Sequence, residues 1–218
     1  MSGNGVAEGS DEIYGVSMVK RAALKSLPSL LMALVLGVTL SPHSAQANEL
    51  KVWDQLKSAN SKGYVLLMRH ALAPGVGDPA NFNVNDCSTQ RNLSDEGRQD
   101  AADIGQWLQQ RKVKIARVET SRWCRAKETA QLLNIGKVRL NKNLDSLFQA
   151  TDLVNHPQTV NIKKRIVSHR NSSGLLVFVG HSVNIQAAVG VSLESGQGVL
   201  VRATPSGEIK VMGYSPTP

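Results

Sequence analysis

Two histidines in this sequence each follow directly on a run of apolar residues. The stretch YVLLMRH leads into Arg69 and His70, and the stretch LLVFVGH ends at His181. Runs that are apolar at every position are typical of strands buried on both faces of a parallel sheet. Ligands bind outside the carboxyl ends of such strands, so we expect Arg69, His70 and His181 to face one site.

A third segment adds an arginine to this predicted site. The strand-like IARVET (residues 115–120) runs into SRWCRAKETA, where we expect a helix to begin with Ser121 as its N-cap and Arg125 in its first turn. Backbone N–H groups at a helix N-terminus, together with a guanidinium group, favour a bound phosphate.

Two arginines and two histidines suit phosphoryl transfer. Guanidinium groups clamp the phosphoryl oxygens, and a neutral imidazole attacks phosphorus in line to form a phosphohistidine that water then hydrolyses. The nearby arginine charges favour the neutral ring that this attack requires.

Four segments together resemble the histidine phosphatase superfamily, also called the phosphoglycerate-mutase-like fold: LLMRHA, NLSDEGRQDA, TSRWCRAKETA and VGHSVNI. The family's first motif is usually Arg-His-Gly, whereas this chain has Ala71 after Arg69 and His70. The resemblance covers most of residues 64–190. It implies an α/β fold, a three-layer α/β/α sandwich with a mostly parallel central sheet. It also implies that His70 is the phosphorylated nucleophile, that Arg69 and Arg125 bind the phosphoryl group, and that His181 belongs to the same pocket.

The resemblance is weaker for the general acid. In this family the acid commonly lies on a segment like L-x-E-x-x-Y/F-G, and NLDSLFQ places Asp145 near that position, with Gln149 in place of the glycine. A proton donor is needed for an alkoxide leaving group and less so for an imidazole. The alternative is that Asp145 caps a helix or is solvated. Arg91 is a further candidate for substrate binding at the pocket rim, with a surface salt bridge as its alternative, and Arg122 is a secondary, substrate-facing candidate.

The N-terminal region has the pattern of an export signal. Residues 18–29 carry three cations and no acid, residues 30–40 are apolar but short for a membrane span, and Ala45 and Ala47 form an A-x-A cleavage pattern. We expect residues 1–47 to be a leader and signal peptide, with Met18 as an alternative start, and residues 48–218 to be one domain exported to the periplasm or an equivalent lumen. An uncleaved anchor would instead hold the enzyme on a membrane.

The two cysteines, Cys87 and Cys124, both lie in the predicted exported domain. In an oxidising compartment two cysteines often pair, although two independent buried thiols are the alternative. The segment GVGDPANFNVNDCSTQRNLS is similar to a small exported subgroup of the family, which pairs a cysteine of this loop with one in the WCR segment. This resemblance implies a Cys87–Cys124 disulfide.

The net charge of +8 favours anionic partners. Aromatic residues make up only 4% and no long basic block is present, which argues against nucleic acid and for a small phosphorylated substrate or a phosphoprotein. The glycines of GVGDPA lack nucleotide P-loop spacing, and no clustered Cys/His pattern suggests a metal site, so we expect no cofactor and no metal.

The other segments frame this site. We expect a short helix over residues 49–59, a long loop over 71–92, a helix capped by Ser94, a short strand over 137–140, weak helix over 151–170 and a hairpin over 198–213. The sequence therefore predicts an exported, metal-independent phosphohydrolase acting on a phosphomonoester or a phosphohistidine. The alternatives are an inactive phosphate-binding module and a phosphomutase.

Overall fold

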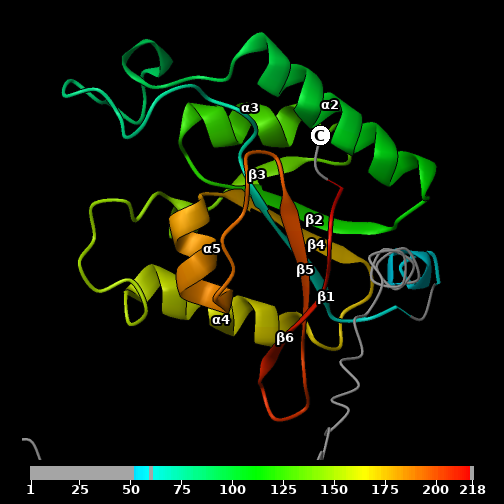
Figure 1. Ribbon diagram of the computed structural model, residues 1–218. Coiled ribbons are helices and arrows are strands. Elements are labelled where there is room, and N and C mark those ends of the chain that lie inside the picture. Colours follow the sequence, from blue (N-terminus) through cyan, green and yellow to red (C-terminus); the bar gives the residue numbers. More distant parts are fainter. Residues whose placement is uncertain (1–51, 59–60, 217–218) are drawn as a thin grey trace, which may run out of the picture. The chain divides into compact units, whose positions relative to one another are not determined.

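The computed structural model describes residues 52–58 and 61–216 (Figure 1). The predicted leader, signal peptide and cleavage site lie outside the described residues. Residues 52–55 are helical, within the predicted helix over 49–59. The remaining elements, in chain order, are β1 (Tyr64–Arg69), η1 (Cys87–Thr89), α2 (Asp95–Gln110), β2 (Ile115–Thr120), α3 (Cys124–Leu132), β3 (Val138–Leu140), η2 (Lys142–Leu144), α4 (Pro157–His169), β4 (Leu175–Gly180), α5 (Ser182–Val189), β5 (Gly198–Ala203) and β6 (Ile209–Tyr214).

The strands form one six-stranded sheet in the order β3-β2-β4-β1-β5-β6. Strands β3, β2, β4 and β1 run parallel to one another, whereas β5 pairs antiparallel with β1, and β6 pairs antiparallel with β5. The predicted mostly parallel sheet and the predicted C-terminal hairpin are therefore confirmed.

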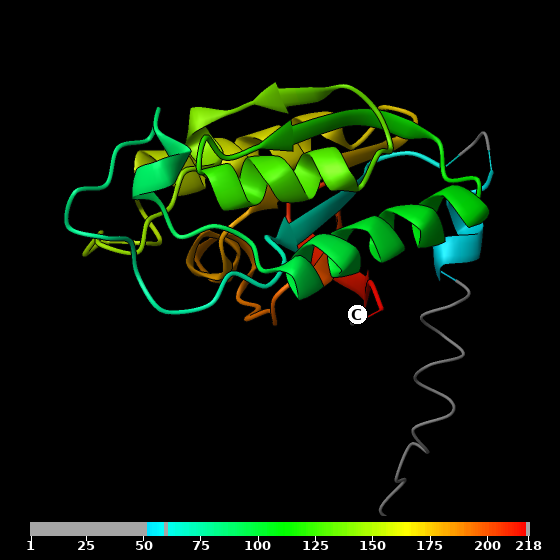
Figure 2. The ribbon, with the colours of Figure 1, turned by 90° about the horizontal axis from the view of Figure 1, so that it is seen from above.

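Helices cover both faces of this sheet (Figures 1 and 2). Helices α2 and α3 pack on one face with Leu66 and Met68 of β1, while α4 and α5 pack on the other face with Val65 and Leu67. Successive side chains of a strand point to opposite faces, so a strand buried on both faces is apolar at every position. The continuous apolar runs of β1 and β4 therefore reflect a three-layer α/β/α sandwich, as predicted.

Two glycines let α2 pack closely against the backbone of neighbouring segments. A Cβ at Gly97 would lie 2.2 Å from the carbonyl oxygen of Leu72, and one at Gly105 would lie 2.1 Å from that of Leu133. Any side chain at these positions would force the backbones apart. Gly97 thus lets the first turn of α2 rest on the segment that directly follows His70.

The helix N-termini test two predicted caps. Ser94 caps α2 as predicted, because its hydroxyl accepts a hydrogen bond from the Gly97 N–H. The cap predicted at Ser121 is wrong: α3 begins at Cys124 with Trp123 at its N-cap position and no side-chain cap bond. The hydroxyl of Ser121 instead contacts His181 and Asp145.

Across the part of the chain that the structure describes, no helix has the length and apolar character needed to cross a bilayer.

Candidate active site

The site lies at a topological switch point of the sheet, where the helices that follow two neighbouring strands cover opposite faces. Neighbouring strands β1 and β4 lead into α2 and α5, which cover opposite faces, and such a switch point leaves a crevice at the carboxyl ends of the strands. The His70 N–H donates to the Gly180 carbonyl over 2.9 Å, and the Ser121 N–H donates to the Val179 carbonyl over 3.0 Å. These bonds bring the residues that follow β1, β2 and β4 together at one edge.

The ring of His70 has a defined tautomer. Its Nδ1 lies 2.8 Å from the carbonyl oxygen of Ala71, which only accepts hydrogen bonds, so Nδ1 carries the hydrogen. The Nε2 atom then has a free lone pair, and it accepts a hydrogen bond from Nε of Arg125 over 3.2 Å. The Ala71 N–H donates to the hydroxyl of Thr129 in α3, which fixes this backbone. The arrangement places the Nε2 lone pair beside a guanidinium group, where it can act as a nucleophile.

Both histidine rings are held neutral. Burial lowers the pKa of His70 to about 3; the hydrogen bond to the Ala71 carbonyl opposes this shift, and the charges of Arg125, Arg69 and Arg91 add to it. Burial also lowers the pKa of His181 well below its usual value, with further lowering from His70 and the same arginines. Near neutral pH, neither imidazole carries a charge.

His181 lies beside His70, and Ser121 and Trp123 hold its ring in place. The two rings meet edge to face with their centres 5.4 Å apart. Nε2 of His181 lies 3.0 Å from the hydroxyl oxygen of Ser121, and the ring of Trp123 packs edge-on against the His181 ring. These contacts hold the second imidazole at the same edge as the first.

Arg125 is a buried cation paired with a partly exposed carboxylate. Its side chain is 3% exposed, and its Nη1 and Nη2 atoms contact the two carboxylate oxygens of Asp78 at 2.5 and 3.3 Å. The indole N–H of Trp123 also donates to Asp78, over 2.9 Å. Burial alone would raise the pKa of Asp78, but the hydrogen bonds and charge of Arg125 and the bond from Trp123 outweigh burial and lower this pKa.

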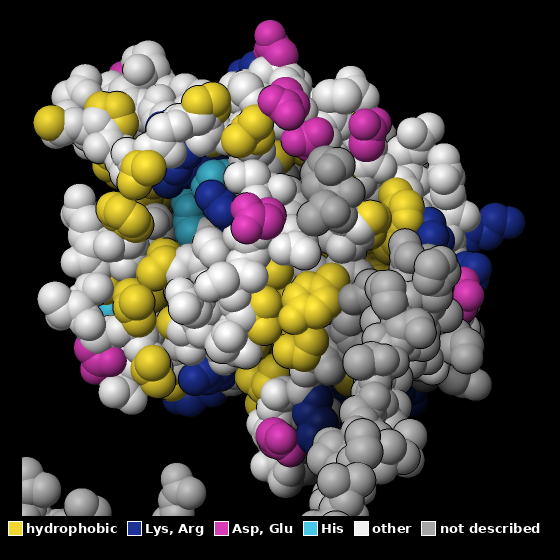
Figure 3. Space-filling view, in the orientation of Figure 1, with side chains coloured by type: hydrophobic (Ala, Val, Ile, Leu, Met, Phe, Trp, Pro, Cys, Tyr) yellow, Lys and Arg dark blue, Asp and Glu magenta, His cyan; other side chains and the backbone are white. Residues whose placement is uncertain are grey.

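His70, Asp78, Arg125 and His181 border one cavity of about 420 Å³. Figure 3 shows its surface as a hollow with histidine and arginine side chains on its floor and hydrophobic side chains around its rim. The hydrophobic rim includes Val76 and Phe148, which are 88% and 62% exposed. A cavity of this size takes a small phosphorylated group.

The structure brings five of the six predicted site residues to this cavity. The five that line it are Arg69, His70, Arg91, Arg125 and His181. Arg69 donates to the carbonyl oxygen of Leu193 over 2.9 Å. Arg91 donates to the carbonyl oxygens of Ala73 and Gly77, so it braces the loop in front of the cavity instead of forming the alternative surface salt bridge.

Asp145, the sixth predicted residue, is buried and does not line the cavity. It is 5% exposed, and its carboxylate accepts hydrogen bonds from the backbone N–H of Arg122 over 2.9 Å and from its side chain in a 2.6 Å ion pair. The solvated alternative for Asp145 is therefore wrong, and Arg122 points to this carboxylate. Asp145 reaches the site through the Ser121 hydroxyl, 3.4 Å from its Oδ1.

Asp78 is the charged residue of the cavity lining that the sequence did not predict. It lies in the predicted loop 71–92, in which Asp86 is the other acidic residue. One sequence feature could have indicated it. The long loop that follows the strand-end His70 contains only two carboxylates, and either of them could face the carboxyl ends of the strands.

A disulfide links this loop to α3. Cys87 and Cys124 are bonded, with their Cα atoms 5.7 Å apart, which confirms the pairing that the family resemblance implied. Cys124 is the first residue of α3 and immediately precedes Arg125. The bond is compatible with an oxidising, extracytoplasmic compartment. Within residues 52–58 and 61–216, no three His, Cys, Asp or Glu side chains gather in a way that would hold a metal ion.

Comparison with known proteins agrees with the motifs. Residues 65–147 match the family model of the histidine phosphatase superfamily, branch 1, which confirms the resemblance over that range. No curated protein matches the sequence.

Several solved structures share the fold. A protein histidine phosphatase SixA complexed with tungstate is 17% identical, with a TM-score of 0.55, and the match covers 70% of this chain and 96% of that one. A phosphoserine phosphatase from Entamoeba histolytica is 13% identical, with a TM-score of 0.53, over 71% and 97%. A mycobacterial glucosyl-3-phosphoglycerate phosphatase is 15% identical, with a TM-score of 0.52, over 72% and 100%.

Proposed function

Residues 65–147 match the histidine phosphatase superfamily, and the chain has the fold of solved histidine phosphatases. On this basis we propose that it is a phosphohydrolase with a phosphohistidine intermediate. Its substrate is a phosphomonoester or a phosphohistidine. The observation that supports the proposal most directly is the position of the His70 Nε2 atom, which lies at the cavity 3.2 Å from Nε of the buried Arg125.

The proposed reaction has two displacements at phosphorus. In the first, the phosphoryl oxygens bind Arg125, Arg69 and the edge of His181, and Nε2 of His70 forms a bond to phosphorus as the bond to the leaving group breaks. In the second, water attacks phosphorus, the P–N bond breaks, and inorganic phosphate leaves with His70 neutral again. Each displacement develops negative charge beside the fixed guanidinium groups, which stabilise it.

The arginines also support metal independence. Arg125 and Arg69 supply the positive charge that a divalent cation would otherwise bring to the phosphoryl oxygens. We therefore expect hydrolysis to persist in the presence of a chelator.

The residues at the cavity rim indicate which leaving groups the site favours. Val76 and Phe148 leave an apolar surface at the mouth, next to the charged floor. Such a rim favours a leaving group with an apolar portion next to the phosphoryl oxygen, which an aryl phosphate or an accessible imidazole of a phosphoprotein provides.

We also propose that the protein is exported to the periplasm or an equivalent lumen after removal of residues 1–47. The disulfide and the sequence pattern of residues 18–47 support this location. N-terminal sequencing of the exported protein is expected to begin at Asn48, and retention of residues 30–40 would instead indicate a membrane anchor.

Hydrolysis of a generic aryl phosphate by wild type and by His70→Ala tests the reaction. We expect wild-type turnover, loss of nearly all activity in His70→Ala, and an acid-labile, alkali-stable phosphoryl group trapped on wild-type protein alone. His156→Ser is the matched control, because His156 caps α4 and serine is also a good cap.

The alternative readings give different results in the same experiment. Binding of inorganic phosphate without turnover of any aryl, alkyl or phosphohistidine substrate would favour a binding module. Transfer of the phosphoryl group to a second alcohol, in preference to water, would favour a mutase.

A further inference from the structure

Asp78 is the single carboxylate among the described residues that line the cavity. Both of its oxygens contact Arg125, and one also accepts the indole hydrogen of Trp123. Its side chain is 19% exposed, so it faces the cavity, whereas the arginine that holds it is buried.

The carboxylate occupies donors that a phosphoryl group would use. Two parallel N–H···O bonds from one guanidinium are the geometry by which arginine binds either a carboxylate or a phosphate. The same guanidinium contacts Nε2 of His70 through its Nε atom. The nucleophile and the Asp78 carboxylate therefore flank one guanidinium, and a phosphoryl group that engages Arg125 takes the place of Asp78.

We propose that Asp78 is the proton donor to the leaving group, released from Arg125 when the phosphoryl group binds there. This inference rests on the proposed phosphohydrolase function. It assigns a catalytic role to a residue of the loop that covers the cavity and makes the enzyme competent for alkyl phosphates, whose alkoxide leaving groups need a proton.

The proton and bond changes balance over one cycle. The released carboxylate takes up a proton from solvent, because a carboxylate that has exchanged a cation for a neighbouring phosphoryl anion is more easily protonated. As Nε2 of His70 bonds to phosphorus and the P–O bond breaks, that proton moves from Asp78 to the leaving oxygen. Water then attacks phosphorus, the P–N bond breaks, and a proton from that water passes to Asp78, which releases it to solvent when phosphate departs and the carboxylate pairs with Arg125 again.

The surrounding contacts keep Asp78 at the cavity during this exchange. Arg91 donates to the carbonyl oxygen of Gly77, which fixes the backbone next to Asp78, so the carboxylate moves by side-chain rotation. Asp145 has no comparable freedom. Its carboxylate is bound by the backbone and side chain of Arg122, and its carbonyl oxygen accepts hydrogen bonds from Gln158 and Asn184.

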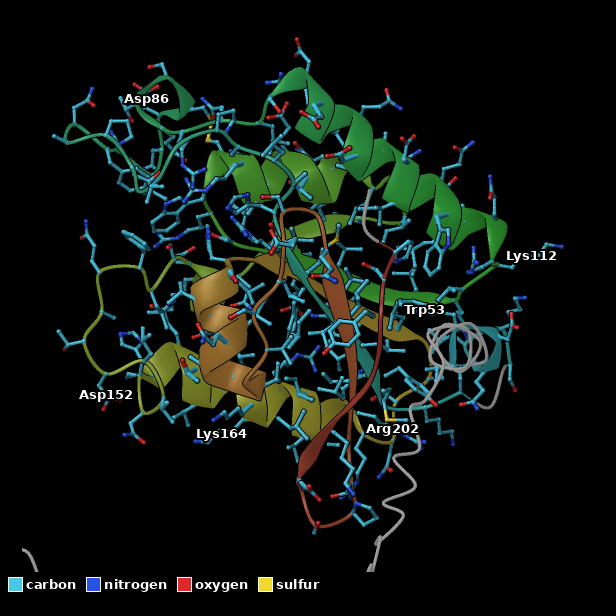
Figure 4. The ribbon with its side chains drawn as sticks, viewed as in Figure 1. Trp53, Asp86, Lys112, Asp152, Lys164 and Arg202 are labelled. Carbon is cyan, nitrogen blue, oxygen red and sulfur yellow. A yellow bond between two sulfur atoms is a disulfide. The ribbon has the colours of Figure 1, made fainter. Side chains whose placement is uncertain are left out.

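A series of leaving groups tests the assignment. The substrates are 2,4-dinitrophenyl phosphate, phenyl phosphate and propyl phosphate, and the variants are Asp78→Asn and the matched control Asp86→Asn. Asp86, labelled in Figure 4, is an exposed carboxylate in the same loop, where it caps η1, and asparagine caps equally well.

We expect the effect of Asp78→Asn to grow as the leaving group becomes more basic. The kcat/KM value should fall about 10²- to 10³-fold for propyl phosphate and about threefold or less for the dinitrophenyl ester. The affinity for inorganic phosphate should rise about tenfold, because the competing carboxylate is gone. Asp86→Asn should match wild type throughout.

Each other outcome overturns a stated part. If Asp78→Asn lowers kcat/KM equally for all three esters, or leaves propyl phosphate hydrolysis intact, Asp78 is not the proton donor, while His70-dependent turnover by wild type still supports the proposed function. If wild type hydrolyses none of the esters and forms no phosphohistidine, both proposals fail. The phosphate-binding measurement shows that each variant retains a folded site.

Discussion

Two arginine–aspartate pairs lie on either side of Trp123, and they are built in opposite ways. In the Arg122–Asp145 pair the side chain of the acid is 7% exposed and the side chain of the arginine is 47% exposed. In the Arg125–Asp78 pair the arginine is 3% exposed and the acid is 19% exposed. The buried member is the aspartate in one pair and the arginine in the other.

The difference shows that two arginines in residues 122–125 have different roles, one in the structure and one at the cavity. The buried carboxylate of Asp145 binds the backbone and side chain of residue 122, and so joins the start of the α3 segment to the end of η2. The buried guanidinium of Arg125 faces a cavity, where another anion can replace its partner. Removing the fixed partner of a buried charge destabilises a fold, whereas a buried charge that faces a cavity is suited to binding and catalysis.

The largest expected effect separates the two arginines in an activity assay. Arg125→Gln removes the guanidinium beside His70 and should lower kcat/KM for an aryl phosphate by about 10³-fold. Arg122→Gln, the matched control, should lower it by less than about tenfold, since Arg122 does not line the cavity. Similar losses in both variants would contradict the division between the pairs.

The disulfide should support the Arg125–Asp78 pair more than the Arg122–Asp145 pair, because it joins the loop that contains Asp78 to the residue before Arg125. It closes a loop with a sequence separation of 37, so replacing both cysteines with serine should lower the free energy of unfolding by about 3–4 kcal/mol. Urea denaturation of oxidised wild type and of the double variant measures this. A loss below about 1 kcal/mol would mean that other contacts already hold the loop in place.

His70, which touches Arg125 and not Arg122, should make stability depend on pH. Its pKa is about 3 in the folded protein and near 6.5 when unfolded, so the unfolded state binds more protons between these values. The free energy of unfolding that comes from keeping His70 neutral is fully present above about pH 6.5. It is lost as the pH falls toward 3. Between pH 6.5 and 4.5, wild type should lose about 2 kcal/mol more than His70→Asn, measured by urea denaturation in phosphate-free buffers. Parallel pH profiles would show that the ring is not held neutral.

The smallest expected effect compares the two aspartates in stability. Asp145→Ala should lower the free energy of unfolding by about 2 kcal/mol, a value reduced for the solvent exposure of Arg122. Asp78→Ala should cost about 0.5 kcal/mol, because water in the cavity can solvate the face of Arg125 that it leaves. Thermal or urea denaturation tests the order, and a larger loss in Asp78→Ala would reverse our reading of which pair is structural.

Much of the site was predictable because its main residues follow strongly patterned elements. Residues 64–68 of β1 and all of β4 lack charged side chains and are buried, and parallel neighbours end at the same edge, so we expected His70 and His181 to meet there. Ser94 likewise precedes a well-patterned helix and caps it. Local sequence sufficed wherever the chain's periodicity determined the direction of a side chain.

The rest depended on contacts between distant residues in irregular segments. Asp78 meets Arg125 across 47 positions, and no periodicity in loop 71–92 indicates which way its carboxylate points. Ser121 has the side chain of an N-cap, yet its hydroxyl is taken by His181, 60 positions away, so the helix starts later. The predicted position of Asp145 near the acid segment gave no sign that Arg122 would hold it behind the cavity.

Strands β1 and β4 are interior strands of the sheet, each paired on both sides. Backbone amides in such positions exchange with solvent deuterium only when the whole domain unfolds, whereas those of the long loop exchange through small local openings. The two imidazoles are therefore attached to the most slowly exchanging part of the molecule. Heat or denaturant should first release the cover of the catalytic cavity and only later its floor, so that turnover declines while the histidine pair is still assembled.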